Sequence, residues 1–338
     1  MQALRLTASN GSKPCLALTT LPKPSLPPST VLVKILAAGI NPSDILNANG
    51  GFHHTAFPRV PGRDYAGIVT DGPVEFVGRE VYGTSGNSLG FSVDGTHAEY
   101  CVIPSESITL KPSNLTFAQA AAVGVPFTAA ALVLRRAMLQ PTDVVLVLGA
   151  SGAVGSAVCQ LARYRGCRVL TAARRDTADV NLVTDPELKA VKSLTDGKGA
   201  DVVIDTTGSP VLMNNALLSL APRGRLAYIA APRQGSTDFT FDMKHVYREE
   251  KIITGCNSVL TGQPETAADL EIMTAGFENG SLQAPKETDL ETIRIEDAVD
   301  VYKMMGNGQG KKFVIVFSNL WDLSVYDTSN CTPVHLRA

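Results

Sequence analysis

The segment VLVLGASGAVGSAVCQLAR, residues 145–163, has the pattern of a turn that binds phosphate groups. An uncharged apolar run ends at Gly149, Gly152 and Gly155 follow, and a helical pattern begins at once. Phosphate binding needs a strand, a tight turn and a helix whose first backbone N–H groups face the anion. The spacing matches the dinucleotide fingerprint with Ala150 in place of the first glycine. We therefore predict a dinucleotide site, with Gly152 beside the pyrophosphate and Gly155 where the helix meets the sheet; a plain buried turn is the alternative.

The residues after the next predicted strand indicate which dinucleotide is bound. About 20 residues on, NAD-binding proteins place an acid that binds the ribose hydroxyls. This chain reads CRVLTAARRD there, with Ala173 or Arg174 at that position and Arg175 next. Asp176 comes one or two positions too late to be the ribose acid. Because arginine binds phosphate in a bidentate fork, the pair predicts NADPH, with a solvated basic turn as the alternative.

The surrounding pattern predicts two domains. Residues 1–115 contain short strands separated by Pro and Gly, which is typical of a mostly antiparallel β domain. A helix is expected to begin at Thr116, which can form a capping box with Gln119. From Asp143 the pattern alternates between strand and helix, as in a doubly wound parallel sheet. The predicted strands of that sheet are 144–149, 168–173, 180–183, 201–205, 225–230 and 251–255.

Composition excludes several classes of function. The 338 residues are 44% apolar and 18% charged with a net charge of −2, which suits a large core and attracts neither nucleic acid nor an anionic membrane. The longest uncharged apolar stretch, 120–134, is shorter than the ~18 residues of a membrane span, and the N-terminus lacks a signal-peptide pattern. Six scattered cysteines without a C-x-x-C pair indicate a reducing compartment. We expect a cytoplasmic protein.

Eight segments, spread over most of residues 1–317, carry a further indication. They are AAGINPSDIL (37–46), VPGRDYAGIV (60–69), GTHAEYCVIP (95–104), AAAVGVPFTAA (120–130), LGASGAVGSAVCQLAR (148–163), GKGADVVIDTTG (197–208), LAPRGRLAYIAA (220–231) and GKKFVIVF (310–317).

In kind and order these segments resemble the zinc-free, quinone oxidoreductase-like branch of the medium-chain dehydrogenase/reductase superfamily. The resemblance implies an α/β protein with a GroES-like, mostly β catalytic domain of residues 1–123 and 265–338. It also implies a Rossmann NADPH-binding domain of residues 124–264, a cleft between the two, and a homodimer formed through an edge strand near 251–258.

The resemblance also bears on metal binding. The zinc enzymes of this superfamily carry Cys where this chain has Asn41 and His-Glu where it has Arg63-Asp64, and they carry a four-cysteine lobe after the position of Gly83. Because thiolates and imidazoles are the ligands of zinc, we predict no metal. The chemistry that remains is hydride transfer from NADPH to a quinone or an activated, carbonyl-conjugated alkene.

The resemblance further assigns roles to single residues. Asn41 at the nicotinamide edge and Thr128 beside the ring and its ribose are the expected catalytic residues; turn chemistry before Pro42 and a core-facing helix residue are the alternatives. Asp44 is expected to be a helix N-terminal charge rather than a base. The expected cofactor-binding residues are Asn41 and Thr128, Ala150 with Ser151, Gly152, Ala153 and Val154 at the pyrophosphate, Arg174 and Arg175 at the 2′-phosphate, and Ile229, Ala230, Gly255 and Cys256 around the carboxamide.

One departure concerns proton donation. Several relatives keep a tyrosine shortly after the N-P-x-D segment, whereas the matching place here holds Phe52, which cannot donate a proton. Protonation would then fall to solvent or to His53, His54 or Tyr65, although a pair of loop histidines is commonly just solvated. Quinone reduction tolerates this loss better, because a hydroquinone anion takes its proton from water.

Two further departures concern the chain itself. Only RRDTAD separates strands 168–173 and 180–183, whereas a parallel crossover normally needs a dozen residues or more. Either the third strand is not a regular member of the sheet or the crossover is reduced to a loop. Residues 318–338, with Trp321, extend past the last strand; a frayed tail is expected, and docking of LWDLSVY is the alternative.

Three functions therefore stay open. The leading hypothesis is a soluble NADPH-dependent reductase of quinones or activated alkenes. The others are a tailoring enoyl reductase of a natural-product pathway and an NADPH-binding protein without catalytic turnover.

Overall fold

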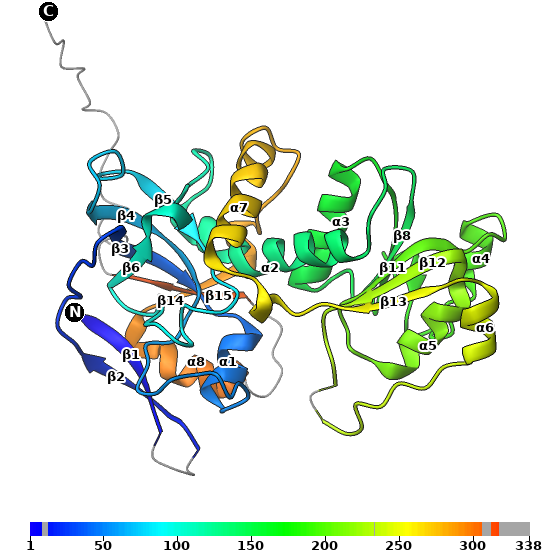
Figure 1. The fold of residues 1–338 in the computed structure, drawn as a ribbon, viewed down its shortest axis with the longest axis horizontal. Helices are drawn as coiled ribbons and strands as arrows, with labels where there is room; N and C mark the ends of the chain where they lie inside the picture. Colours follow the sequence, from blue (N-terminus) through cyan, green and yellow to red (C-terminus); the bar gives the residue numbers. More distant parts are fainter. Residues whose placement is uncertain (9–12, 233, 306–311, 318–338) are drawn as a thin grey trace, which may run out of the picture.

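The described part of the chain forms two lobes that lie side by side (Figure 1). Helix α2 (Phe117–Arg136) leads from the first lobe to the second, and α7 (Gln263–Glu278) lies on the way back. Strands β14 (Leu290–Ile293) and β15 (Lys312–Val316) then rejoin the first lobe. This computed structural model describes residues 1–8, 13–232, 234–305 and 312–317.

The sheet of the first lobe combines strands from both ends of the chain. Its order is β14-β15-β3-β4-β5-β7, and β6 pairs with β3. Because β15 is antiparallel to β3, Lys312 at the start of β15 lies at the end of β3 from which α1 departs. The remaining elements of this lobe are β1 (Gln2–Thr7), β2 (Cys15–Thr20), β3 (Thr30–Gly39), α1 (Pro42–Ala48), β4 (Asp64–Asp71), β5 (Glu80–Gly83), β6 (Tyr100–Pro104), β7 (Thr109–Leu110) and α8 (Ala298–Met305).

The second lobe is a six-stranded parallel sheet of order β10-β9-β8-β11-β12-β13. The order reverses direction between β8 and β11, as in a doubly wound fold. The predicted α/β class, a β domain joined to a parallel sheet, is confirmed. The elements are β8 (Val144–Leu148), α3 (Ala153–Tyr164), β9 (Arg168–Ala173), β10 (Val180–Asn181), α4 (Ala190–Leu194), β11 (Ala200–Asp205), α5 (Pro210–Ser219), β12 (Leu220–Tyr228), α6 (Met243–Arg248) and β13 (Ile252–Gly255).

Strand β8 shows why its sequence, VVLVL, is apolar throughout. Val145 and Val147 pack in the cluster that contains α2 and α3, while Leu146 and Leu148 pack in the cluster on the other face with α5. A strand covered on both faces needs no polar residue, which is typical of parallel sheets. The uncharged run before the glycines is therefore the centre of the second lobe's core.

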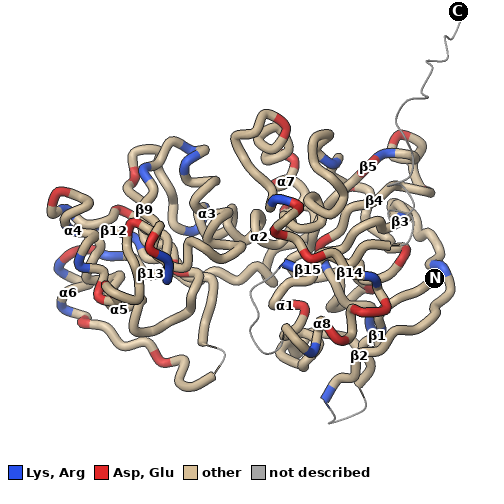
Figure 2. Tube along the Cα trace, turned by 180° about the vertical axis from the view of Figure 1, so that it is seen from behind, with Lys and Arg blue, Asp and Glu red and all other residues tan. Residues whose placement is uncertain are grey.

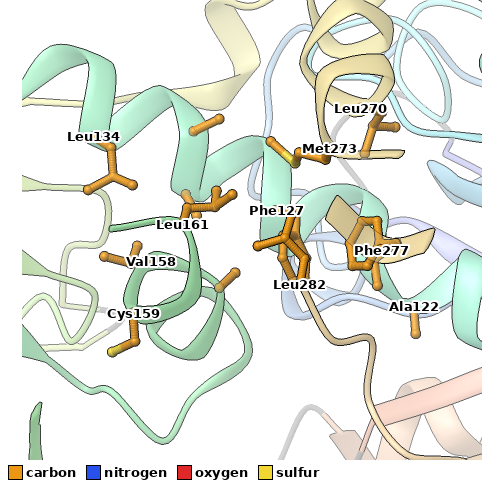
Figure 3. Packing of buried hydrophobic residues seen from close by; sticks show 14 of the residues in the cluster. Ala122, Phe127, Leu134, Val158, Cys159, Leu161, Leu270, Met273, Phe277 and Leu282 are labelled. Atoms are coloured by element: carbon orange, nitrogen blue, oxygen red, sulfur yellow. The ribbon is translucent and has the colours of Figure 1, made fainter. Parts of the chain in front are cut away.

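Helix α2 joins the cores of the two lobes. It begins at the predicted capping box, in which the Gln119 N–H donates to Thr116 Oγ1 and the Thr116 N–H to Gln119 Oε1. Phe127 packs edge-on against Phe277 of α7, with ring centroids 4.9 Å apart (Figure 3). Among the described residues one helix, α2, has the length and apolarity of a membrane span, but 78% of its apolar window is buried inside the protein. Its apolarity thus belongs to the core.

The short connection after β9 is a loop rather than a helical crossover. Residues 174–179 turn the chain back, and β10 then pairs with β9 in parallel over two residues. Asp179 closes the loop by accepting hydrogen bonds from the N–H and Oγ1 of Thr171, each at 2.7 Å. The sequence left two alternatives, an irregular third strand or a crossover reduced to a loop. The structure has both features, since β10 is only two residues long and the crossover has no helix.

The other differences between the predicted and the observed helices and strands are small. The expected strand 180–183 is shorter, and strand 225–230 begins earlier, at Leu220. The sequence pattern did not predict α4, α6 or β14. Residues 318–338 lie outside the described residues. The boundary at 123/124 falls within α2, so it stays a prediction.

Candidate functional site

The carboxyl ends of the parallel strands form one edge of the second lobe. Leu148 is in register with Ala172 and with Asp205, Asp205 with Tyr228, and Tyr228 with Gly255. In open α/β sheets ligands bind at this edge, outside the ends of the strands. The predicted cofactor residues of this lobe lie at or directly after this row, at 150–154, 174–175, 229–230 and 255–256.

The turn between β8 and α3 has room for a phosphate group. A Cβ at Gly155 would lie 2.2 Å from the carbonyl oxygen of Gly149, so only glycine allows the helix to approach this closely. Gly152 is exposed, and a Cβ there would meet nothing nearer than 3.3 Å. The Ala150 N–H is used within the sheet, where it donates to the carbonyl of Ala172. The N–H groups of Ser151, Ala153 and Val154 have no partner among the described residues, and those of Ala153 and Val154 belong to the positive end of the α3 dipole.

The two arginines at the end of β9 are available for a ligand. Arg174 and Arg175 are exposed, and neither guanidinium has an ion pair or hydrogen bond to the described residues. Asp176 is engaged, since its Oδ1 accepts a hydrogen bond from Asn181 Nδ2 at 2.7 Å. The loop therefore presents two unpaired cations and holds its carboxylate away from them.

A cavity of about 330 Å³ opens at the other end of the row. Gly255 and Cys256 line it from β13, and Leu132 and Arg136 line it from α2. Ile229 and Ala230, half-buried after β12, lie at the same edge of the sheet. The sequence therefore brings these four predicted residues to the junction of the lobes.

In the first lobe, Asn41 belongs to a buried network rather than to an open surface. The residue is 2% exposed. Its Nδ2 donates to Asp64 Oδ2 at 2.8 Å, and its Oδ1 accepts from Lys312 Nζ at 2.8 Å. Asp64 is fully buried, and its Oδ1 accepts the N–H of Val125 on α2 at 2.8 Å. Both ends of the Asn41 amide are thus bound inside the protein.

A second buried ion pair lies beside this network. Asp44 accepts the backbone N–H of Asn41 at 2.8 Å through Oδ2 and the Nε of Arg63 at 3.2 Å through Oδ1. Nη2 of Arg63 donates to Ser43 Oγ. Asp44 is therefore a charge in the first turn of α1, as the sequence indicated, and it is also the partner of Arg63.

Burial governs the charge state of Lys312. Desolvation lowers the pKa of its ammonium below the ordinary value, while the nearby Asp64 and Asp44 carboxylates oppose the shift. Its ion pair with Asp64, at 3.7 Å, joins β15 to β4. The two cations and two carboxylates of this region balance one another in a nearly dry environment.

Thr128 lies where the two lobes meet. It is 7% exposed, and its hydroxyl donates to the carbonyl of Gly124 at 2.9 Å along α2. With Arg63 it lines a narrow pocket of about 10 Å³ whose other wall includes Ser258 and Thr261. A Cβ at Gly86 would lie 2.1 Å from the carbonyl oxygen of Ser258, so the lobes are in close contact here.

The candidate proton donors are placed differently from one another. The Tyr65 hydroxyl is buried without a hydrogen-bond partner among the described residues, and burial raises its pKa far above the ordinary value. His53 and His54 are exposed. The His54 ring lies 4.7 Å from that of Phe91, and Phe52 packs edge-on against Phe91 at 5.2 Å. Phe52 thus belongs to an aromatic cluster with His54, whereas Tyr65 belongs to the core.

The described residues also bear on ion binding. Among them, no group of three or more His, Cys, Asp or Glu side chains could hold a metal ion. Lys and Arg are interspersed with Asp and Glu along both lobes (Figure 2), so neither lobe is dominated by one charge.

A larger cavity, about 590 Å³, lies in the first lobe by Lys111 and Phe117 and holds none of the predicted site residues.

Sequence reasoning missed several residues that shape this site. The sequence pattern assigns no role to Lys312 or Gly86, and it marks Arg63 only as the residue at a position where the zinc enzymes carry a ligand. Lys312 contacts Asn41 across 271 positions of sequence, a separation at which no local pattern gives a signal. Two adjacent charges in an otherwise apolar segment, Arg63-Asp64, were the one available signal of a buried ionic site.

Comparison with known proteins agrees with this architecture. Residues 27–113 match the alcohol dehydrogenase GroES-like domain, and residues 153–275 match the zinc-binding dehydrogenase family. A zinc-type alcohol dehydrogenase-like protein of Schizosaccharomyces pombe is 48% identical over 94% of this chain and 98% of its own length. A quinone oxidoreductase of Sus scrofa is 33% identical over 60% of this chain and 64% of its own length. The crystal structure of an NAD-dependent alcohol dehydrogenase, 27% identical, matches 94% of this chain and 99% of its own with a TM-score of 0.78.

Proposed function

The chain belongs to the medium-chain dehydrogenase/reductase superfamily and is an oxidoreductase of that type, and from this premise we propose that it uses NADPH, without zinc, to reduce a quinone or an activated, carbonyl-conjugated alkene. The observation that carries the proposal is the pair of exposed, unpaired arginines beside a turn with room for phosphate. The solved neighbour described as NAD-dependent makes the choice of dinucleotide the first point to test.

The cofactor would be held at the carboxyl edge of the parallel sheet. When bound, NADPH supplies a hydride. The N–H groups at the start of α3 would bind its pyrophosphate, with Gly152 leaving the space that the phosphates fill. Arg174 and Arg175 would bind the 2′-phosphate. The backbone at residues 229–230 and 255–256 would border the carboxamide.

Thr128 and Asn41 would then serve different purposes. Thr128 lines the narrow pocket that shares Leu132 and Thr261 with the cavity of about 330 Å³, which supports a place for Thr128 beside a nicotinamide ring held in that cavity. Asn41, with its amide bound at both ends, would hold Lys312 and Asp64 at the edge of the site. Independence from zinc is supported by Arg63, because a buried guanidinium at a former ligand position repels a second cation.

Turnover against a small panel tests the proposal. NADPH oxidation is measured with an ortho-quinone, a simple enone and an enoyl thioester, with NADH as the control. Turnover of the quinone or the enone, with NADPH preferred, is the expected result. Turnover of the thioester alone would favour a tailoring enoyl reductase instead. Tight NADPH binding without any turnover would favour a binding protein.

Removing the arginine pair is expected to weaken the binding of NADPH and to leave the binding of NADH nearly unchanged. The double variant Arg174→Ala/Arg175→Ala loses charge-assisted hydrogen bonds that exist only with a 2′-phosphate, so NADPH affinity should fall by about 2–4 kcal/mol. NADH affinity should stay nearly unchanged. Titration calorimetry measures both, and Arg165→Glu, at an exposed arginine after α3, is the control because it changes the net charge by the same amount as the double variant. Equal losses for both nucleotides would show that the pair does not bind the 2′-phosphate.

We also propose that the protein is a homodimer that forms through β13. This strand is an edge of the parallel sheet, and Ile252 at its start is 42% exposed. An uncovered edge strand pairs readily with a second copy. Light scattering should give twice the mass of one chain, and the mass of a single chain at micromolar concentration would contradict the proposal.

The described cysteines are free thiols, which supports a reducing, cytoplasmic location.

A further inference from the structure

Arg63 is an unusual cation because it is buried and only partly bonded. The residue is 2% exposed. Nε donates to Asp44 and Nη2 to Ser43, whereas Nη1 has no hydrogen-bond partner among the described residues. Nη1 is not one of the fully buried polar atoms that lack a partner among the described residues, so it keeps some contact with solvent and is accessible to a ligand. Arg63 lines the narrow pocket between the lobes, which is where a missing partner would lie.

The guanidinium is held in place before any ligand arrives. Asp44 is fixed by the backbone N–H of Asn41 at 2.8 Å and in turn fixes Nε of Arg63. The ring of Phe91 covers the guanidinium, with Cζ 5.4 Å from the ring centroid. A charged donor that is fixed in a nearly dry site stabilises developing negative charge without reorganisation.

The space beside Arg63 suits a single oxygen atom. The pocket of about 10 Å³ is close to the minimum volume that holds one water molecule. The hydroxyls of Thr128 and Thr266 in its wall already donate to the carbonyls of Gly124 and Thr84. Arg63 is therefore the charged donor left for a ligand.

Resting on the function proposed above, we infer that Nη1 of Arg63 donates a hydrogen bond to the carbonyl oxygen of the substrate and stabilises the negative charge that this oxygen gains. For a conjugated alkene, a C–H bond of the dihydronicotinamide ring would break, and its electron pair would form a C–H bond at the β carbon of the substrate. The C=C π bond would shift toward the carbonyl, and the oxygen would take the charge. The coenzyme is oxidised, and the substrate is reduced by two electrons.

Arg63 supplies charge in this step but no proton. A guanidinium stays protonated throughout the physiological range, so the enolate or the hydroquinone anion takes its proton from water. This explains how the chain can dispense with a tyrosine at Phe52. The substrate class that this role requires is a conjugated ketone or quinone that presents one carbonyl oxygen to the guanidinium.

Binding of 4-nitrophenolate to the full-length, cofactor-free protein tests this inference separately from catalysis. The phenolate presents one charged oxygen on a planar ring, and its ionisation is read by absorbance. Arg63→Met should weaken phenolate binding roughly tenfold or more, whereas Arg63→Lys should recover part of it. The matched control is Arg59→Met, because Arg59 also has an aspartate ion pair at 3.2 Å, with Asp94, but does not line the pocket.

Kinetics give the second readout. Arg63→Met should lower kcat/KM for the accepted substrate about 100-fold, with NADPH affinity changed by less than about threefold. Unchanged phenolate binding in Arg63→Met, or an equal loss in Arg59→Met, would overturn the inference. Phenolate binding that depends on Arg63 in a protein that oxidises no NADPH would support the oxygen site and contradict the proposed function. If Arg63→Met fails to fold, as judged by circular dichroism, Arg63→Lys decides: a partial loss of phenolate binding and of turnover supports the inference, and wild-type values for both overturn it.

Discussion

Gly152→Val is expected to weaken NADPH binding by more than 100-fold while the protein stays folded. Gly152 is exposed at the start of α3, and a Cβ there would meet only the carbonyl oxygen of Gly149, at 3.3 Å. The protein therefore tolerates a side chain at this position, but the pyrophosphate would occupy the same space. Because valine is a poor N-cap residue, the free energy of unfolding should fall by about 1 kcal/mol or less. Titration calorimetry and thermal unfolding measure the two effects.

Gly262→Val is the matched control for this variant. Gly262 is the N-cap of α7 with φ −75° and ψ 165°, nearly the same backbone conformation as Gly152, with φ −79° and ψ 166°. A Cβ at Gly262 would meet nothing nearer than 3.7 Å. The control should lose the same small amount of stability and keep its NADPH affinity. Retained affinity in Gly152→Val would mean that the phosphates bind elsewhere.

The features that the sequence predicted well are those in which one local pattern determines both structure and position. The glycine turn follows directly from the VVLVL strand, and the sheet brings residues 229–230 and 255–256, which the resemblance assigned, to the same edge as residues 150–154. The capping box of Thr116 is likewise a contact over three residues. Such features depend on periodicity and turn chemistry, which single sequences contain.

The features that escaped prediction depend on contacts between distant segments. Asn41 is preceded by an ordinary strand and followed by Pro42, so nothing local shows that its amide lies between Asp64 and Lys312. Tyr65 is one residue from Asp64, yet it points into the core because successive side chains of a strand face opposite sides. The pairing of β15 with β3 brings Lys312 to Asn41, and no local pattern reveals this contact.

The Asp64 carboxylate is the point at which these distant contacts meet. It is fully buried, and it accepts hydrogen bonds from the Val125 N–H and Asn41 Nδ2, both at 2.8 Å, with Lys312 Nζ at 3.7 Å. An asparagine at position 64 would keep the shape but replace one acceptor with an NH₂ group that faces a donor. It would also leave the Lys312 ammonium without its carboxylate, and burial already disfavours that charge.

Asp64→Asn is therefore expected to lower the free energy of unfolding by about 3–5 kcal/mol, the range for a broken buried ion pair. Asp94→Asn is the control, because Asp94 is half-exposed and its pairs with Arg5 and Arg59 should be worth about 1 kcal/mol or less. Adding Lys312→Met to Asp64→Asn removes the stranded ammonium and should recover part of the loss, as a double-mutant cycle in urea would measure. Equal losses for Asp64→Asn and Asp94→Asn would show that the buried carboxylate contributes no more stability than a half-exposed one, although its bonds reach Asn41, α2 and β15 at once.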